Sequence, residues 1–235
     1  MFERPHHQRI AHVLEALDGQ MLRSHACWFG GGTCIALRFG EYRESVDMDF
    51  LVSDAVGYRE LRQLLTGPEG LAPITRAGAS PLVLEREVRA DQYGIRTRVR
   101  MDGQAIKFEI VREVRIELAL PGPDDVICGV GALSVLDLAA SKLLANSDRQ
   151  ADDGVFSRDV IDLAMMDLSL AQLRAAVEKA SQAYGMAVTR DLAKAIDSLQ
   201  HRTGWLERCM QVMAMDMPKA VLWQKVRNLR RVLPA

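Results

Sequence analysis

A run of three glycines followed by a threonine precedes two closely spaced aspartates in this sequence. The segment reads WFGGGTCIALRFGEYRESVDMDFLV and spans residues 28 to 52. Backbone N–H groups at the start of a helix bind anions, and glycine lets a phosphate approach the chain closely. Two carboxylates held side by side repel each other unless a cation lies between them. Together the two features predict a site for a nucleoside triphosphate and its metal ions.

The glycine run is predicted to connect a strand to a short helix. If ACWF is a strand, residues 30–32 form a tight turn, and Thr33 opens a helix that runs to Arg38. The N–H groups of its first turn would then face outward as an anion site. The alternative is a structural turn in which Thr33 is the N-cap of the helix. The segment is not a Walker A loop, because no Gly-Lys-Ser or Gly-Lys-Thr follows.

The aspartates lie in the alternating segment DMDFLV. The two-residue period of a strand puts Asp47 and Asp49 on one face and Met48 and Phe50 on the other. Carboxylate oxygens at this spacing suit Mg²⁺, which completes its shell with water and substrate phosphate oxygens. The alternative is a solvated strand end, but a pair of aspartates behind a GGGT turn favours the metal site.

A hairpin supplies a third carboxylate. Asp102-Gly103 separates IRTRVRM from QAIKFEIV and is a strong signal for a two-residue turn. The resulting register pairs Arg96 with Glu109 and leaves one apolar face and one charged face. Glu109 is then either an ion-pair partner of Arg96 or a metal ligand or base beside the aspartates. The same face would offer RNA phosphates four cations: Arg96, Arg98, Arg100 and Lys107.

Two kinds of element are expected to position these residues. An amphipathic helix over residues 6–24 opens the chain, and strand-like runs at ACWF, DMDFLV, PLVLEREV, IRTRVRM, AIKFEIV and VRIELAL follow, with a helix over residues 58–65. From Leu133 the pattern is helical, interrupted by the polar connection at residues 146–154. We therefore expect an α+β chain: a mixed β-sheet with helices over residues 1–125, and a helical bundle over residues 126–235.

Composition excludes several classes of protein. The chain has 235 residues, 49% of them hydrophobic, and a net charge of −1, so any anion site must be local. Its four cysteines lie far apart with no zinc-ligand spacing, which argues against a disulfide framework. No apolar run is long enough to span a membrane, and the first residues do not resemble a signal peptide. We expect a cytoplasmic protein with no membrane partner.

Four segments resemble the AbiEii/AbiGii toxin family of nucleotidyltransferases, a branch of the DNA polymerase beta-like superfamily. GGGTCIALRFG is similar to the family's GGT-x-LALRLG block, and ESVDMDFLV to its S-x-DIDF block. LSVLDLAASKLLANSDR is similar to the helical block that bears a lysine, and SRDVIDLAMM to the RD-x-x-DL block. These segments occur in the family's order between residues 30 and 166.

The resemblance implies Mg²⁺-dependent transfer of a nucleoside monophosphate from an NTP to an acceptor, often by the toxin of a toxin–antitoxin pair. In studied relatives the acceptor is the 3′ end of a transfer RNA, so an RNA acceptor and an antitoxin protein are the expected partners. The resemblance assigns roles as follows: Gly31, Gly32 and Thr33 hold the triphosphate, Asp47 and Asp49 bind Mg²⁺, Lys142 meets phosphate, and Asp159 is the catalytic carboxylate of the last block.

Some assignments stay open. The interval between Lys142 and Asp159 is longer than the family's, so Asp162 competes with Asp159 for the key position. Glu109 stands where an aspartate would be expected if that position were catalytic. Lys142 has no acidic residue four positions before or after it, which leaves it free to reach an anion or solvent. Two other functions remain: nucleotide transfer to a small molecule or a protein, and a non-catalytic module that binds nucleotide or a partner.

Overall fold

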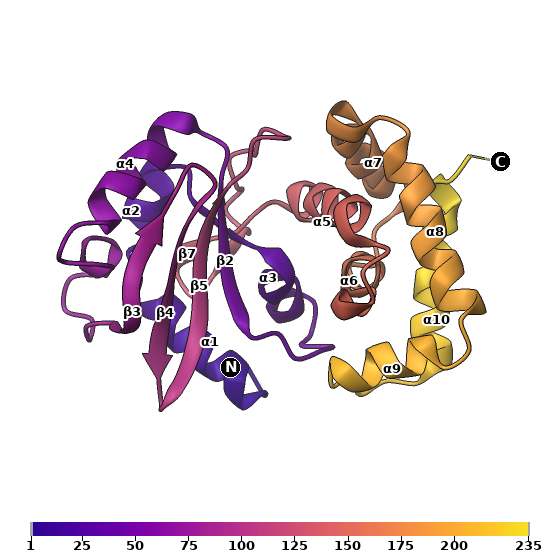
Figure 1. The fold of residues 1–235 in the computed structure, drawn as a ribbon, viewed down its shortest axis with the longest axis horizontal. Helices are drawn as coiled ribbons and strands as arrows, with labels where there is room; N and C mark the ends of the chain where they lie inside the picture. Colours follow the sequence, from indigo (N-terminus) through magenta and orange to yellow (C-terminus); the bar gives the residue numbers. More distant parts are fainter. Residues whose placement is uncertain (1, 235) are drawn as a thin grey trace. The chain divides into compact units, whose positions relative to one another are not determined.

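The computed structural model describes residues 2–234. The chain forms two compact units. One comprises the chain up to Arg38 together with Ser45–Ser134, and the other comprises Phe39–Glu44 together with the chain from Val135 onward. The first unit contains a five-stranded mixed sheet, and the second is built from helices (Figure 1). The α+β class expected from the sequence, with a sheet followed by a helical part, is confirmed.

The sheet has the strand order β1-β2-β5-β4-β3. Figure 1 labels its strands β2, β5, β4 and β3. Neighbouring strands are antiparallel except β2 and β5, which run parallel. The strands are β1 (Trp28–Gly30), β2 (Asp47–Val52), β3 (Val83–Ala90), β4 (Gly94–Met101) and β5 (Gln104–Arg112). All five predicted runs that end before residue 113 therefore form strands, with shifted ends at most of them.

The β4–β5 hairpin has the register that Asp102-Gly103 predicts. Met101 pairs with Gln104, Arg96 with Glu109, and Ile95 with Ile110. Asp102 and Gly103 both have positive φ, at 48° and 76°, as a two-residue type I′ turn requires. One face of the hairpin is fully buried through Ile95, Val99, Ile106, Phe108 and Ile110. Burial of that face fixes the register, because a one-residue slip would expose every one of these side chains.

Four helices and a 3₁₀ turn accompany the sheet: α1 (Pro5–Ala16), α2 (Gly19–Ser24), α3 (Gly31–Arg38), α4 (Ala55–Leu65) and η1 (Ala72–Ile74). The prediction of a single opening helix over residues 6–24 is wrong, since the helix is interrupted at Leu17 and Asp18. The Asp18 carboxylate accepts hydrogen bonds from the N–H groups of Gln20 at 2.9 Å and Met21 at 3.0 Å. It therefore caps a second helix, whose apolar spacing continues that of the first.

The strand expected at VRIELAL, residues 114–120, is absent. β2 ends at Val52, opposite Arg112, so the chain beyond Arg112 has no neighbouring strand on that side to pair with. Val114 is 73% exposed, which is atypical of a strand packed on a core. The next strands are the short β6 (Val126–Ile127) and β7 (Val130–Gly131), which form a separate hairpin that the sequence did not indicate.

The units differ from the expected division at residue 125 in two respects. Residues 126–134 stay with the sheet, because the Leu133 N–H donates to the Phe29 carbonyl at 2.9 Å and Phe29 forms a bridge with Ala132. Residues 39–44, between α3 and β2, belong to the helical unit. A sequence pattern cannot reveal such an excursion, because the segment is too short to show a period.

The helical unit contains α5 (Val135–Arg149), η2 (Asp153–Val155), α6 (Arg158–Met165), α7 (Leu170–Tyr184), α8 (Ala187–His201), α9 (Trp205–Val212), α10 (Lys219–Asn228) and η3 (Leu229–Val232). α5 packs against α6, α7 and α8, and α6 packs against α10. Residues 146–149 of the expected polar connection extend α5. Among the described residues, no helix is long and apolar enough to cross a membrane.

Candidate functional site

The glycine turn contacts the aspartate strand directly. β1 ends at Gly30, which pairs with Asp49 of β2, and α3 begins at the next residue. Gly31 has φ +69°, and a Cβ atom there would lie 2.6 Å from Asp49 Oδ2. Glycine is therefore required at position 31 both by the backbone conformation and by the adjacent carboxylate. The predicted proximity of turn and aspartate is present.

The start of α3 supplies N–H groups suited to an anion. The helix begins at Gly31, two residues before the predicted start, so the N–H groups of Gly31, Gly32 and Thr33 belong to its first turn and have no acceptor within the helix. Gly31 and Gly32 are both partly exposed. The backbone of these three residues is therefore the part of the turn that can contact a phosphate.

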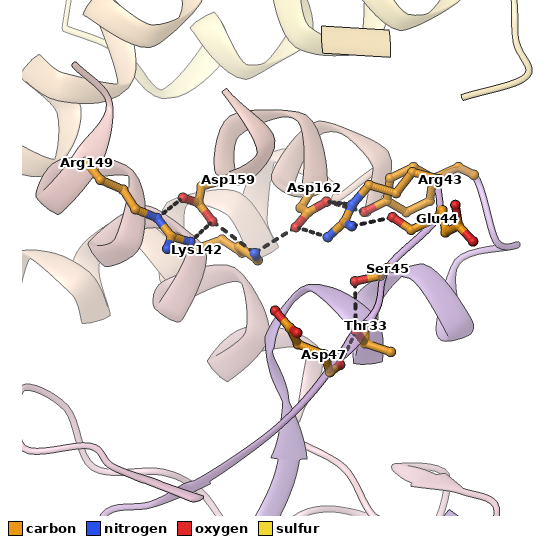
Figure 2. Close-up of polar contacts among 10 residues, drawn as sticks. Thr33, Arg43, Glu44, Ser45, Asp47, Lys142, Arg149, Asp159 and Asp162 are labelled. Atoms are coloured by element: carbon orange, nitrogen blue, oxygen red, sulfur yellow. Dashed lines mark hydrogen bonds and ion pairs between the residues drawn. The ribbon is translucent and has the colours of Figure 1, made fainter. Parts of the chain in front are cut away.

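The Thr33 side chain has a different role from either one that the sequence suggested. It is 1% exposed, and its hydroxyl donates to the Asp47 carbonyl and hydrogen-bonds the Ser45 hydroxyl, the latter at 2.7 Å (Figure 2). Thr33 lies inside α3, so it is not the N-cap. Its hydroxyl ties α3 to the start of β2, which leaves only its backbone N–H for a ligand.

Asp47 and Asp49 lie on one face of β2, as the alternation predicts. Both are partly exposed, whereas Met48 and Phe50 are completely buried on the opposite face. The buried pair anchors the strand in the core, since Phe50 packs between Phe29 and Phe108 with ring centroids 5.4 and 5.3 Å apart. The core thus holds the two carboxylates in a fixed orientation.

Glu109 lies beside Asp49. β2 and β5 are parallel with Asp49 opposite Glu109 and Asp47 opposite Lys107. The Glu109 carboxylate also accepts a hydrogen bond from Arg96 Nε at 2.5 Å and lies 2.5 Å from Lys107 Nζ. The two interpretations of Glu109 are therefore compatible in geometry: it pairs with Arg96, and it neighbours the aspartates.

The Glu109 carboxylate changes the acidity of both cations that it contacts. Its hydrogen bond is the largest cause of the raised pKa of Arg96. Burial lowers the pKa of Lys107, but the hydrogen bond to Glu109 and the charges of Asp49 and Asp47 raise it above its ordinary value. Lys107 therefore stays protonated and places a positive charge beside Asp47, which lies opposite it on β2.

The donor set fits Mg²⁺ bound together with a nucleotide. No group of three or more His, Cys, Asp or Glu side chains in residues 2–234 has the arrangement of a metal site made by protein alone. Mg²⁺ binds instead through one or two carboxylates and takes phosphate and water oxygens for its remaining positions. The hard oxygen donors of Asp47 and Asp49, two residues apart on a strand, match that requirement.

A second set of charged residues lies in the helical unit and centres on α6. Asp162 is completely buried and accepts a hydrogen bond from Tyr42 at 2.6 Å. It also accepts two hydrogen bonds from Arg43, at 2.6 and 2.9 Å (Figure 2). Lys142 Nζ lies 2.7 Å from the same carboxylate. Asp162 thereby holds the short segment Phe39–Glu44 against α5 and α6. No sequence pattern indicated a role for Tyr42 or Arg43.

Asp159 completes this network. Its carboxylate lies 2.9 Å from Lys142 Nζ and accepts two hydrogen bonds from Arg149, at 2.7 and 2.9 Å (Figure 2). Burial raises the pKa of both Asp159 and Asp162, but the neighbouring cations lower it by more than burial raises it, so both carboxylates stay ionised. We call Tyr42, Arg43, Lys142, Arg149, Asp159 and Asp162 the α6 network.

The α6 network changes the interpretation of Lys142. The lysine has no acid at helical spacing, but it contacts carboxylates 17 and 20 residues later in the chain and is 6% exposed. Arg149 follows Lys142 by two helical turns on the same face of α5, a spacing that could have indicated a shared partner. The Lys142 ammonium would have to break its ion pair with one of these carboxylates before it could contact a phosphate.

The model of one protein family matches residues 13–227, a range that includes the glycine turn, the aspartates and the α6 network. The family is described as the nucleotidyl transferase AbiEii toxin of type IV toxin–antitoxin systems. The chain belongs to this AbiEii family. It is therefore a nucleotidyltransferase, its substrates include a nucleotide, and it comes from a toxin–antitoxin context.

Two solved structures share the fold of this chain. A Helicobacter pylori protein described as a nucleotidyltransferase is 15% identical, with a TM-score of 0.51 over 96% of this chain and 94% of its own. JHP933 from Helicobacter pylori is 14% identical, with a TM-score of 0.54 over 99% of this chain and 93% of its own. At such identities the likeness shows the fold alone. No curated protein matches the chain.

The charged face of the AbiEii chain's sheet carries more arginine than the β4–β5 hairpin alone. The register between β3 and β4 places Arg86 opposite Arg98, and Arg89 opposite Arg96. Arg98 also lies opposite Lys107 on its other side. Like charges in direct cross-strand pairs are unfavourable without an anion. Sequence reasoning missed the contribution of β3, because two register shifts in that strand change which residues face β4.

Carboxylates balance only part of this face. Glu85 lies 2.9 Å from Arg100 and 3.7 Å from Arg98, and Asp91 lies 3.0 Å from Arg96. Arg86 and Arg89 form no ion pair within 4.0 Å among the described residues. The four predicted cations are 41% to 48% exposed, which keeps them accessible to a ligand. We call Arg86, Arg89, Arg96, Arg98, Arg100 and Lys107 the basic sheet face.

Proposed function

We propose that this AbiEii nucleotidyltransferase moves a nucleoside monophosphate from an NTP to an RNA acceptor, such as the 3′ end of a transfer RNA, with Mg²⁺ held by Asp47 and Asp49. The observation that carries the proposal is the close approach of the Asp49 carboxylate to Gly31, where an added Cβ atom would lie 2.6 Å from Oδ2. It brings the N–H groups that suit a phosphate next to the oxygens that suit its metal.

In this proposal the first turn of α3 binds the triphosphate. The N–H groups of Gly31, Gly32 and Thr33 donate to phosphate oxygens, and the positive end of the helix favours the anion. Asp47 and Asp49 hold Mg²⁺, which when bound neutralises charge on the phosphates as pyrophosphate leaves. Lys107, opposite Asp47, adds a positive charge next to the aspartates, since its raised pKa keeps it protonated. These residues act mainly by positioning and by electrostatic stabilisation.

Glu109 is the better candidate for orienting the attacking hydroxyl. It lies opposite Asp49, and its side chain is 12% exposed. The alternative, Asp159, has a lowered pKa because Lys142 and Arg149 stabilise its charge, so it is a weak proton acceptor. We therefore propose that Asp159 and Asp162 stabilise the α6 network. Lys142 can contact a phosphate only if it first breaks its ion pair with one of these carboxylates.

The basic sheet face supports RNA over a small acceptor. A row of residues crosses four strands from Arg86 through Arg98 and Lys107 to Asp47. Such a row suits a chain of phosphates that approaches the aspartates, whereas a small molecule would need only the end of the row. An RNA acceptor and an NTP also imply a reaction in the cytoplasm. The type IV toxin–antitoxin family further suggests an antitoxin partner.

A labelling experiment tests the proposal. The purified chain is incubated with Mg²⁺, total RNA and each of the four NTPs labelled at the α-phosphate. We expect label in RNA with at least one nucleotide, and none when EDTA replaces Mg²⁺. Label in the protein itself or in a small molecule would show that this molecule, and not RNA, is the acceptor. Absence of label under every condition, with nucleotide binding retained, would favour a non-catalytic binding module.

A further inference from the structure

The helical unit contains an open pocket with a volume of about 370 Å³, separate from the glycine turn and the aspartates. It lies where η2 meets the connection between α8 and α9 and is lined by Asp153, Gly154, Phe156, Arg202, Thr203, Gly204, Trp205 and Arg208. None of these residues takes part in the α6 network or has a part in the proposed transfer.

Two aromatic rings and two guanidinium groups form a stack along this pocket. The rings of Phe156 and Trp205 are nearly parallel, at 21°, with centroids 6.0 Å apart. The guanidinium carbon of Arg202 lies 4.1 Å from the centroid of the Trp205 ring, and that of Arg208 lies 5.9 Å from the Phe156 ring. Planar groups of this kind bind nucleobases by stacking, with little regard to base identity.

The backbone holds Phe156 in an unusual conformation. Phe156 and Ser157 both have φ 51°, in the left-handed region that bulky residues rarely adopt. The Trp205 indole N–H donates to the Ser157 hydroxyl at 2.9 Å, which ties this bend to the start of α9. Strain of this kind persists where the surrounding structure enforces it, and it often marks a binding site.

The charges favour an anion. Arg202 forms two hydrogen bonds with Asp153, at 2.6 and 2.8 Å, which satisfies the only carboxylate that lines the pocket. Arg208 is exposed and forms no ion pair within 4.0 Å among the described residues. One guanidinium therefore remains for a phosphate beside the aromatic surface.

We propose that this pocket binds a nucleotide, with its base against the partly exposed Phe156 ring and the exposed Arg202 guanidinium and its phosphate on Arg208. The Trp205 ring is 6% exposed, so it supports these two groups and does not itself face the base. The volume falls in the range of small-ligand sites. The nucleotide can be free or can be one unit of a single-stranded RNA, because both present the same base and phosphate. This inference does not depend on the proposed transfer reaction, because it uses none of the residues assigned to it.

The test measures binding to the full chain in EDTA, which suppresses metal-dependent binding at the aspartates. The probe is a fluorescein-labelled hexaribonucleotide followed by anisotropy, with CMP, AMP and cytidine as competitors. Phe156→Asn removes the ring but keeps a residue that tolerates positive φ, and Arg208→Gln removes the charge. Arg174→Gln is the matched control, because it removes an exposed arginine of the same unit outside the pocket.

Loss of one stacking or phosphate contact should weaken binding about tenfold in Phe156→Asn and Arg208→Gln, and less than about twofold in Arg174→Gln. Competition by CMP or AMP would identify a free-nucleotide site, whereas binding of the hexamer alone would identify a unit of RNA. Equal competition by cytidine and CMP would overturn the assignment of Arg208 to phosphate. Equal affinity in all variants, with unchanged melting temperatures, would overturn the pocket as a nucleotide site.

Discussion

Asp49 of β2 is in contact with the position that a Cβ atom of residue 31 would occupy, since that atom would lie 2.6 Å from its Oδ2. The same aspartate is paired across the parallel strands with Glu109. The turn, the aspartate and the glutamate therefore form one continuous row across β1, β2 and β5, and each part can be tested separately.

Replacement of Asp49 by Asn should abolish nucleotide transfer and spare the fold. The amide keeps the shape next to Gly31 but removes the charge that holds Mg²⁺, so the transfer rate should fall at least about a hundredfold. Asp47→Asn should have a smaller effect. The melting temperature should stay the same or rise, because one of two repelling acids is gone. Loss of folding, together with Mg²⁺-independent activity in the wild type, would reassign these residues to the scaffold.

Replacement of Gly31 by Ala should weaken triphosphate binding as well as stability. The methyl group would meet Asp49, and an alanine at φ +69° costs about 1–2 kcal/mol in backbone strain. Gly40→Ala is the matched control, because Gly40 also has positive φ, at 84°, but a Cβ there meets no atom within 4 Å. The control should lose stability only. Equal triphosphate affinity in the Gly31 variant and the parent would make the turn purely structural.

Replacement of Lys142 by Met should destabilise the helical unit strongly. It would leave Asp159 and Asp162 buried with fewer cations, and breaking a buried ion pair costs about 3–5 kcal/mol. Lys219→Met removes a lysine that pairs with Glu207 at the surface, where the two side chains are 56% and 52% exposed, and should cost less than about 1 kcal/mol. Urea unfolding measures both. A Lys142 variant as stable as the control, but inactive, would instead favour direct contact of Lys142 with phosphate.

The α6 network should also make stability depend on pH in the acid range. The pKa of Asp162 is lowered in the folded chain, so its contribution is complete above the unfolded pKa of about 3.9 and is lost as the pH falls below that value. The free energy of unfolding of Asp162→Asn should therefore approach that of the wild type as the pH drops below about 4. A constant difference between pH 7 and pH 3 would contradict the ionised state of Asp162.

Removal of Arg86 and Arg98 should weaken RNA binding in a salt-dependent way. If each contacts one phosphate of a single strand, the slope of log affinity against log salt should shrink by about 1.4 in the double serine variant. Stability should not fall, because the two arginines lie opposite each other. Exposed Arg59 and Arg62 of α4 give a matched double control. An unchanged slope would exclude these arginines from the acceptor site, and weaker triphosphate binding would assign them to the nucleotide.

The parts of this site that depend on local spacing were predictable from the sequence. Alternation in β2 placed Asp47 and Asp49 on one face, and the Asp102-Gly103 turn fixed the partner of Glu109. The parallel pairing of β2 with β5, which brings Glu109 beside Asp49, follows from tertiary packing and has no local signal.

Other features required the structure because their residues are far apart in the chain. Arg43 and Asp162 are separated by 119 residues, and neither segment shows a pattern that names the other. The arginines of β3 face β4 only through two register shifts, which a regular strand period cannot predict. Threonine is a residue type favoured at N-caps, but Thr33 lies within α3, because the helix already begins at Gly31.

The most direct test compares two labels of the same NTP in the presence of Mg²⁺ and RNA. Nucleotidyl transfer moves the α-phosphate and releases pyrophosphate, so we expect that α-labelled NTP labels RNA, that γ-labelled NTP does not, and that Asp49→Asn loses the α-label. Transfer of the γ-label would show a phosphoryl transfer instead. Full α-labelling by the Asp49 variant would contradict the placement of the metal and the triphosphate at Gly31 and Asp49.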